Sequence, residues 1–217
     1  MLSVVIPALD AEGCLPGCLQ ALGDVPDLVV VDGGSRDGTR AVAFGAGARV
    51  VDSPRGRGVQ LAAGAEAARG DWLLFLHADT RLSPGWRSAV AAHVARSDAA
   101  ACFRFQLDDA AWQARVIERG VGLRVRLLGL PYGDQGLLVS RALYGQVGGY
   151  RPLPLMEDID LVRRIGRTRL VMLDAAAVTS ADRWRRDGWA RRSARNLACS
   201  ALHKLGMSAE RVVKFYG

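Results

Sequence analysis

The segment GDWLLFLHAD, residues 70–79, decides the fold. After the turn at Gly70-Asp71 come five consecutive apolar residues, 72–76, which end directly in His77-Ala78-Asp79. An apolar run of this length between turn residues is typical of a strand that is buried on both faces of a sheet. Polar residues follow it at once, where the carboxyl end of such a strand would lie. The segment therefore predicts a buried strand that delivers polar side chains to a sheet edge.

Other segments repeat this pattern along the chain. Expected strands cover residues 2–7, 27–32, 49–52, 101–107, 135–140 and 170–173. Expected helices cover residues 10–22, 58–68, 86–95, 111–128, 157–165 and the last 30 residues. Two serines are expected at helix starts, Ser35 as the cap of a further helix and Ser83 before Pro84. The alternation predicts an α/β fold with a mostly parallel central sheet and helices on both faces.

Composition and spacing indicate one globular domain. Half of the 217 residues are hydrophobic and 24% are charged, which supports a core and is not typical of a disordered chain. No linker or internal repeat interrupts the pattern. We expect a single domain over residues 1–217, with a nucleotide-binding half at 1–100, an acceptor half at 101–180 and a basic helical tail at 181–217. No stretch reaches about 18 uninterrupted apolar residues, so we expect a cytoplasmic protein.

The cysteines do not form a metal motif. Cys14 and Cys18 lie one helical turn apart, but Cys102 and Cys199 give no second pair at metal-ligand spacing. Four cysteines are also too few to build a disulfide framework in a chain of this length. We expect reduced and buried thiols.

The tail carries most of the net charge of +7, with nine basic and three acidic residues in 181–217. Nucleic-acid binding is the weakest interpretation because no recognised module accompanies the charge. A solvated helical face is the ordinary one. The sharper hypothesis is peripheral contact with anionic lipid through Trp184, Trp189 and neighbouring arginines, at the inner face of the membrane.

Polar residues gather at four successive strand ends. Ligands bind at the carboxyl ends of parallel strands, where carboxylates accept from a base or ribose and arginines bind phosphate. Asp79 offers a hard oxygen ligand to Mg²⁺ or Mn²⁺. Singly, each residue has an ordinary explanation as a turn cap, a solvated charge or a core histidine. Together they favour a nucleotide diphosphate with a divalent cation. The residues are Asp10, Glu12, Asp32, Asp52, Arg55, Arg57, His77 and Asp79.

Several segments together resemble the family 2 glycosyltransferases with the GT-A fold. The segments are Val4-Val5-Ile6-Pro7-Ala8, VVVDGGSRDGT at 29–39, GDWLLFLHAD at 70–79 and Met156-Glu157-Asp158. Finer details are similar to a bacterial subgroup usually labelled arsenosugar-biosynthesis or radical-SAM/selenodomain-associated glycosyltransferase. Those details are His77-Ala78-Asp79-Thr80, Gly133-Asp134-Gln135, PLMEDI at 154–159 and Arg183-Trp184.

The resemblance implies a role for each matching position. Residues expected to line the nucleotide-sugar pocket are Pro7, Ala8, Glu12, Asp32, Gly34, Arg57, Gln60, His77, Ala78, Asp79, Arg183 and Trp184. Among them, Asp32 would contact the base, uracil by expectation, and Asp79 would bind Mn²⁺ or Mg²⁺ at the diphosphate. Asp158 would be the general base, with Glu157 beside it in the acceptor site.

Three positions depart from the family pattern. His77 stands where the metal motif commonly has a first aspartate, and a neutral imidazole suits Mn²⁺ better than Mg²⁺. Ser180 stands where the Gln of a Gln-x-x-Arg-Trp motif is usual, and Asp10 where Asn is frequent. The resemblance therefore implies a metal motif with one carboxylate fewer than the family pattern has.

The expected function is inverting, metal-assisted transfer of a sugar from a UDP-sugar donor to a hydroxyl of a small-molecule or lipid-linked acceptor. A dinucleotide oxidoreductase is excluded because Pro7-Ala8-Leu9-Asp10 replaces its Gly-x-Gly-x-x-Gly after the first strand. A non-catalytic protein that binds nucleotide-sugar or an anionic surface, with a degenerate metal site, is the alternative.

Overall fold

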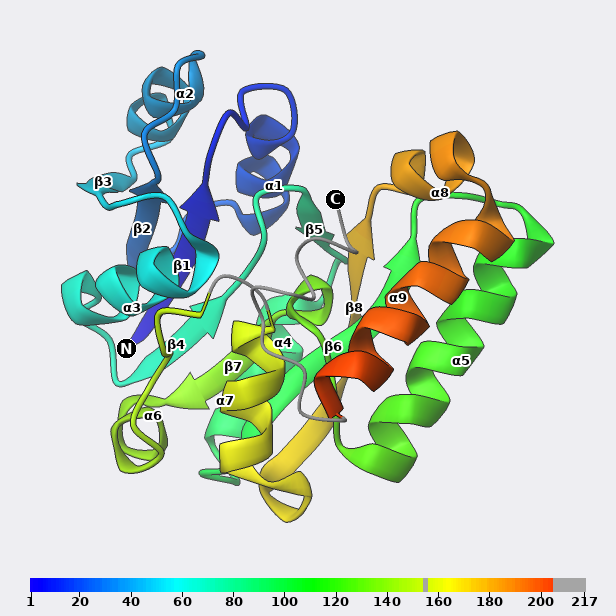
Figure 1. Ribbon diagram of the computed structural model, residues 1–217. Helices are drawn as coiled ribbons and strands as arrows, with labels where there is room; N and C mark the ends of the chain where they lie inside the picture. Colours follow the sequence, from blue (N-terminus) through cyan, green and yellow to red (C-terminus); the bar gives the residue numbers. More distant parts are fainter. Residues whose placement is uncertain (154–155, 205–217) are drawn as a thin grey trace.

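The computed structural model describes residues 1–153 and 156–204, without the side chains of residues 196, 197 and 199–204 (Figure 1). Pro154 and Leu155 of the resemblance motif, the Cys199 side chain and the end of the basic tail at 205–217 lie outside the described residues. Among the described helices, none combines the length and apolarity that crossing a membrane requires.

One eight-stranded sheet runs through the described residues, in the order β3-β2-β1-β4-β7-β6-β8-β5. Pairs β1–β2, β1–β4, β2–β3 and β6–β8 are parallel, whereas β7 is antiparallel to β4 and β6, and β5 to β8. This confirms the predicted α/β fold with a mostly parallel sheet. The strands are β1 (Leu2–Ala8), β2 (Asp27–Asp32), β3 (Arg49–Asp52), β4 (Trp72–Phe75), β5 (Thr80–Leu82), β6 (Ala100–Leu107), β7 (Leu137–Ser140) and β8 (Leu170–Thr179).

Helices cover both faces of this sheet because alternate residues of each central strand are apolar on both sides. On one face, Ile6 and Leu74 pack in the same cluster as Leu15 and Trp86. That face carries α1 (Leu15–Leu22), α2 (Thr39–Gly45) and α4 (Trp86–Val94). The other face carries α3 (Arg57–Ala67), α6 (Arg141–Gln146) and α7 (Glu157–Ile165), which pack on Val5, Leu73 and Phe75.

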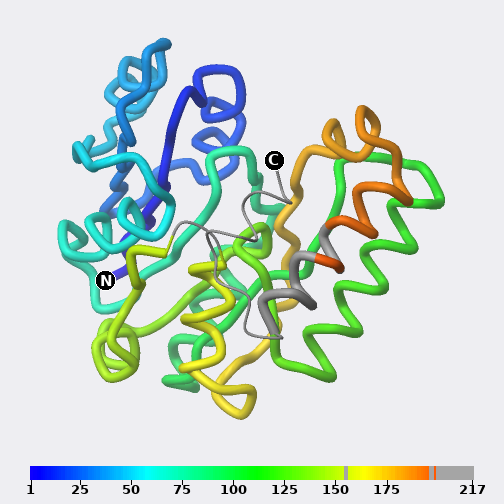
Figure 2. Tube along the Cα trace, viewed as in Figure 1, coloured from blue at the N-terminus to red at the C-terminus, as the bar shows by residue number. Residues whose placement is uncertain are grey.

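A smaller cluster forms beyond β6. It joins α5 (Trp112–Leu128) and α8 (Asp182–Asp187) through Ala114, Trp184 and Phe105. Helix α9 (Trp189–Lys204) follows α8. Figure 2 shows the arrangement along the trace, with the segments from β1 to α3, blue to cyan, on one side and α5 and α8 on the other. The active-site candidates lie between these two sides.

Both serine caps predicted from the sequence are wrong. Helix α2 begins at Thr39 after Gly38, without a side-chain cap, because the Ser35 hydroxyl donates to Asp32. Helix α4 begins at Trp86 after Gly85. Ser83 instead connects the end of β5 to β8, because its hydroxyl accepts a hydrogen bond from the Ala176 amide.

Several predicted boundaries also shift. Helix α1 begins at Leu15 rather than at residue 10, and β8 runs on to Thr179 rather than ending at 173. The short strand β5 was not predicted, because three residues give too little pattern. Residues 133–135 form a 3₁₀ turn, η1 (Gly133–Gln135), before β7. These shifts matter for the site, since η1 and the end of β8 both line it.

Candidate active site

A cleft of about 420 Å³ opens at the carboxyl edge of the central strands. Elements far apart in the sequence line it: the segment after β4, the start of α3, η1, the start of α7 and the start of α8. The sequence-predicted residues on its wall are Arg57, His77, Asp79, Asp158, Arg183 and Trp184. The edge that binds ligands in open α/β sheets thus carries the cleft here.

Buried polar atoms without hydrogen-bond partners converge on this cleft. Among the described residues they include Asp79 Oδ1, Asp134 Oδ1 and Trp184 Nε1. A fourth, Glu157 Oε2, borders the narrow crevice that shares His77, Tyr132, Gly133 and Asp158 with the cleft. A buried polar atom without a partner costs about 1–3 kcal/mol, so four in one place indicate a site built for a polar ligand.

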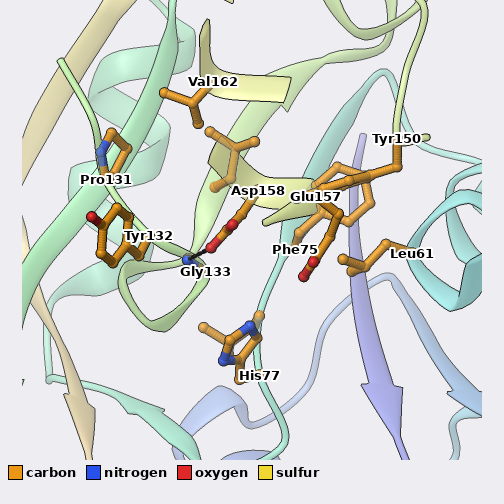
Figure 3. A pocket seen from close by; sticks show the side chains of 13 residues that line it. Leu61, Phe75, His77, Pro131, Tyr132, Gly133, Tyr150, Glu157, Asp158 and Val162 are labelled. Carbon is orange, nitrogen blue, oxygen red and sulfur yellow. Dashed lines mark hydrogen bonds between the residues drawn. The ribbon is translucent and has the colours of Figure 1, made fainter. Parts of the chain in front are cut away.

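Asp158 is held by backbone amides. Its Oδ2 accepts from the Gly133 amide at 2.5 Å, and its Oδ1 accepts from the Ile159 amide at 2.7 Å (Figure 3). The residue that precedes this helix turn, Met156, has a positive φ of 65°, which a non-glycine side chain rarely adopts. Such strained backbone is concentrated at functional sites, and here it directs Glu157 and Asp158 to the cleft.

Glu157 and Arg57 form an ion pair across the sheet edge. The Glu157 side chain is 1% exposed and the Arg57 side chain 39% exposed, and Arg57 Nε donates to Glu157 Oε1. Burial raises the pKa of Glu157, against the charge of Arg57, which lowers it, while Asp158 raises it further. The pair therefore joins the start of α3 to the start of α7.

His77 is uncharged in this setting. Burial lowers the pKa of His77 to about 3, and the charges of Arg57 and Arg183 act in the same direction. The ring lies against η1 so closely that a Cβ at position 133 would come 2.5 Å from Nε2. Gly133 is therefore needed where it is, because only a residue without a side chain lets η1 approach the imidazole.

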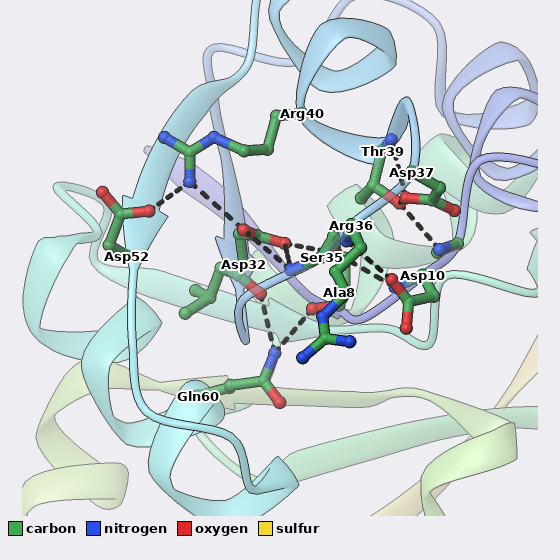
Figure 4. Close-up of polar contacts among 12 residues, drawn as sticks. Ala8, Asp10, Asp32, Ser35, Arg36, Asp37, Thr39, Arg40, Asp52 and Gln60 are labelled. Atoms are coloured by element: carbon green, nitrogen blue, oxygen red, sulfur yellow. Dashed lines mark hydrogen bonds and ion pairs between the residues drawn. The ribbon is translucent and has the colours of Figure 1, made fainter.

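The predicted base-contacting residue, Asp32, faces a dense set of donors (Figure 4). Its side chain is 2% exposed and accepts from the Ser35 amide and hydroxyl and from Arg40. Burial alone would raise the pKa of Asp32, but the hydrogen bonds from Ser35 and Arg40 bring it below its ordinary value. Asp32 is thus an ionised, preorganised acceptor, and Arg40 also reaches Asp52.

Asp10 and Glu12 hold the loop after β2. The Asp10 carboxylate accepts from the Arg36 amide at 2.8 Å, and the Glu12 carboxylate accepts from the Gly38 amide at 2.9 Å. Asp10 has a positive φ of 48°, a conformation that Asp and Asn tolerate better than most residues. This explains why Asp can stand where Asn is frequent. Both carboxylates are exposed, but in this structure they bond the loop.

Gln60 bridges two strand ends. Its amide nitrogen donates to the Ala8 carbonyl at 2.8 Å and to the Val31 carbonyl at 2.9 Å. Pro7 and Ala8 are buried at the end of β1. Gly34 is exposed with a φ of 91°, which favours glycine. These residues shape the nucleotide side of the edge, and the structure gives Gln60 a bracing role that the sequence did not indicate.

The start of the tail lines the cleft, but not as expected for a lipid anchor. Arg183 is exposed on the wall, whereas Trp184 is 8% exposed and its ring lies 6.3 Å from that of Phe105. A side chain packed in this way cannot insert into a bilayer, so the hypothesis that Trp184 anchors lipid is wrong. Trp184 instead lines the cleft from α8.

Sequence reasoning gave no role to several residues of the wall. Asp134 lines the cleft from η1, and Arg186 and Arg192 line it from α8 and α9. Their signals were present as Gly133-Asp134-Gln135 and the basic tail, but only the fold brings them to Asp79. Cys14 also lies on the wall and is exposed, contrary to the expectation, whereas Cys18 and Cys102 are buried as expected.

No group of three or more His, Cys, Asp or Glu side chains arranged to hold a metal occurs in the part of the chain that the structure describes. Asp79 Oδ1 is nevertheless buried without a partner, which suits a hard cation. A cation here would complete its shell with oxygens of a diphosphate or water. His77 is neutral, so it adds no charge to that shell.

Curated relatives are similar in sequence to part of this chain. A PGL/p-HBAD biosynthesis glycosyltransferase of Mycobacterium bovis is 39% identical over 94 residues, which cover 38% of this chain and 36% of the relative. The glucosyl-3-phosphoglycerate synthase of Mycolicibacterium paratuberculosis is 36% identical over 92 residues, 36% of this chain and 28% of the relative. The chain thus matches about a third of the length of these relatives.

Solved structures share the fold over most of the chain. Mycobacterium tuberculosis glucosyl-3-phosphoglycerate synthase, in complex with Mn²⁺, UDP and glucosyl-3-phosphoglycerate, superposes with a TM-score of 0.58 at 20% identity. The match covers 83% of this chain and 70% of the other. S. aureus TarS 1-349 in complex with UDP-GlcNAc gives a TM-score of 0.64 at 17% identity, over 82% and 58%.

A family model matches more than half of the chain. The model described as "Glycosyl transferase family 2" covers residues 3–140, which include β1, β2, β4, the segment after β4 and η1. The matched residues include Asp79 and Asp134 of the cleft wall, whereas Asp158 and the residues from α8 and α9 lie beyond them. This chain belongs to glycosyl transferase family 2.

Proposed function

We propose that this chain transfers a sugar from a nucleotide-diphosphate donor, a UDP-sugar, to a hydroxyl group of an acceptor. The observation that carries the proposal is the convergence of four unpartnered buried polar atoms, from Asp79, Asp134, Glu157 and Trp184, on one cleft edge. Family membership and a fold shared with structures that hold UDP or UDP-GlcNAc support it.

The nucleotide is proposed to lie along the ends of β1, β2 and β4. Asp32 is an ionised acceptor for a donor of the base, with Arg40 sharing its carboxylate in the free protein. Arg57 begins α3 beside the cleft, so its guanidinium and the amides of that helix turn suit phosphate oxygens. Glu12 and Gly34 shape the loop that faces the ribose.

The reaction is proposed to invert the anomeric carbon, with Asp158 as general base. The acceptor oxygen attacks the anomeric carbon from the side opposite the diphosphate while its proton passes to Asp158. The bond from that carbon to the diphosphate oxygen breaks, and UDP leaves with its electron pair. The amides of Gly133 and Ile159 already fix the carboxylate, so no reorganisation is needed before proton transfer.

A divalent cation fits the site at Asp79, whose buried oxygen has no hydrogen-bond partner. Mn²⁺ or Mg²⁺ bound there would neutralise negative charge that develops on the leaving diphosphate. Two structural neighbours are described with Mn²⁺ or with Mg²⁺ beside UDP, which supports this choice. Arg183 and Arg57 carry positive charge to the same region.

Glu157 is proposed to shape the acceptor side. It is buried, pairs with Arg57 and precedes the base directly, so it fixes the start of α7 while its free oxygen borders the crevice. We keep a small-molecule or lipid-linked hydroxyl as the acceptor class. The narrower subgroup, arsenosugar-biosynthesis or radical-SAM/selenodomain-associated glycosyltransferase, is likewise proposed from the sequence details alone.

The decisive experiment is a donor screen on the wild-type chain. Thermal unfolding is measured with UDP-, GDP- and dTDP-sugars, with and without Mn²⁺, and donors that stabilise are then assayed for UDP release with hydroxyl acceptors. We expect a UDP-sugar to raise the unfolding midpoint more with Mn²⁺ than without, and to be consumed. Binding without consumption would favour the non-catalytic alternative, which the lack of a three-ligand metal cluster among the described residues also favours.

A further inference from the structure

We propose that Asp134 is a second protein ligand of the divalent cation, which it would bind together with Asp79 from the adjoining turn η1. The inference rests on the proposed function and deepens it. Neither the sequence patterns nor the strand-end argument assigned a role to Asp134, which lies on η1 between β6 and β7.

The sheet register brings Asp134 to the metal segment. Strands β4 and β7 are antiparallel, with Phe75 paired to Leu137. The residue between η1 and β7, Gly136, lies against the residue that precedes the His77-Ala78-Asp79 segment, since a Cβ there would lie 3.3 Å from Leu76 Cδ1. The position of Gly133 against the His77 ring confirms that η1 and this segment touch. Two carboxylates on adjoining loops therefore face one cleft.

Both carboxylates lack a partner on their buried side. Asp79 Oδ1 and Asp134 Oδ1 are inaccessible to solvent, and neither has a hydrogen bond. Two carboxylates that line one cleft with unpartnered buried oxygens are stabilised by a cation between them.

The turn that carries Asp134 is rigid. Gln135 is fully buried, and its amide nitrogen donates to the Phe103 carbonyl at 3.0 Å. Its carbonyl oxygen accepts from Arg124, whose guanidinium stacks 3.5 Å from the centre of the Tyr132 ring. A ligand held on a braced turn pays little ordering entropy when a metal binds. Mn²⁺ and Mg²⁺ prefer such carboxylate oxygens together with phosphate and water.

The test measures Mn²⁺ binding, not turnover. Free Mn²⁺ is titrated by electron paramagnetic resonance against wild type, Asp134→Asn and Asp79→Asn with saturating UDP. Asp174→Asn is the matched control, because it removes one negative charge from a side chain that is fully exposed away from the cleft. UDP affinity without metal and the unfolding midpoint are measured for every variant.

We expect Asp134→Asn to weaken Mn²⁺ affinity about tenfold or more. Asp174→Asn should leave the affinity unchanged, and metal-free UDP binding of Asp134→Asn should stay at the wild-type level. The unfolding midpoint of Asp134→Asn should equal or exceed that of wild type, since the change removes a buried charge.

Two results would overturn the inference. If Asp134→Asn binds Mn²⁺ as tightly as wild type while Asp79→Asn does not, Asp134 is no ligand and the proposed function stands. If wild type itself binds no Mn²⁺ with UDP, the two-carboxylate site is wrong. UDP release from a UDP-sugar by the wild type then decides separately whether the proposed function also fails.

Discussion

Gly133 sets the closest approach in the site. Its amide donates to the base Asp158, and the absence of a side chain lets His77 pack against η1. Few positions combine a functional hydrogen bond with such a steric limit. The positive φ of Met156 adds strain on the other side of the same hydrogen bond. The base is thus positioned by backbone geometry more than by charged partners.

Replacing Gly133 with alanine should therefore harm the site. The new Cβ would lie 2.5 Å from His77 Nε2, so η1 must shift. The hydrogen bond from the residue 133 amide to Asp158 then lengthens. We expect a loss of stability of about 1–3 kcal/mol, measured by urea unfolding, and a fall in transfer rate of tenfold or more. Gly145→Ala is the control, because a Cβ there meets nothing within 4 Å. Equal behaviour of the two variants would contradict this account.

The hydrogen bonds of Asp27 make the free energy of unfolding depend on pH. It accepts from the Ser3 hydroxyl at 2.6 Å, the Arg69 amide at 2.8 Å and Arg49 at 2.7 Å. Burial would raise the pKa of Asp27, but these donors lower it below its ordinary value. Since the folded pKa lies below the unfolded one, about 3.9, the ionised group stabilises the fold above that pH. This contribution is lost as pH falls through the folded pKa.

Asp27→Asn should consequently destabilise the protein at neutral pH by about 2 kcal/mol, a value kept modest because Arg49 is 35% exposed. The difference from wild type should shrink as the pH drops below about 4. Denaturant unfolding between pH 3 and 7 measures it, with the exposed Asp24→Asn as control. A difference that stays constant with pH would show that the Asp27 charge plays no part.

At the element scale, Gln60 ties α3 to the ends of β1 and β2. Its amide nitrogen donates to two buried strand carbonyls, that of Val31 and that of Ala8, which also accepts from the Gly33 amide. The resemblance to family 2 glycosyltransferases implied that Gln60 lines the nucleotide-sugar pocket. It could not reveal the bridge, since the bridge depends on the angle at which α3 crosses the sheet.

Gln60→Met should keep the volume and remove both hydrogen bonds. We expect a loss of about 2 kcal/mol in unfolding free energy, because both buried hydrogen bonds of the Gln60 amide are lost. UDP affinity should fall too, since the same strand ends carry Ala8 and Asp32. Calorimetric titration of UDP and urea unfolding measure both effects, against Gln20→Met on the exposed face of α1. A variant as stable as wild type would rule out the bracing role.

The sequence predicted strands with an unbroken apolar run well and elements without one poorly. Strands β1, β2 and β4 followed from unbroken apolar runs, because burial on both faces leaves a strong pattern. The three-residue β5 was missed, and Ser83 was taken as a helix cap although β8 uses its hydroxyl. Local patterns describe what a residue can do, and long-range pairing decides what it does.

At the scale of the whole molecule, the site forms where the two halves meet. Ile6 and Leu74 share one core cluster with Phe103 and Leu173 from the second part of the chain. The sequence predicted that Arg57, His77 and Asp79 lie at one edge of the sheet, and all three line the cleft there. It could not show that η1 adds Asp134, because the antiparallel insertion of β7 beside β4 leaves no local signal.

The proposed roles predict that UDP binding and sugar transfer depend on different residues of the cleft. Arg57 and Asp79 reach the cleft from α3 and the segment after β4, whereas Asp158 comes from α7. Binding of UDP and transfer of the sugar should therefore be separable by one substitution. Asp158→Asn keeps the size of the side chain and one oxygen for the Gly133 amide but removes the base.

The most direct test compares UDP release and UDP binding in wild type and Asp158→Asn, with the UDP-sugar identified by the donor screen and Mn²⁺ present. We predict that transfer falls about 1,000-fold while the UDP dissociation constant changes less than about threefold. The control is Asp160→Asn, two residues further along α7, where the carboxylate pairs with Arg164 at 2.5 Å; this variant should retain transfer. Transfer by Asp158→Asn at a rate near that of wild type would contradict the account.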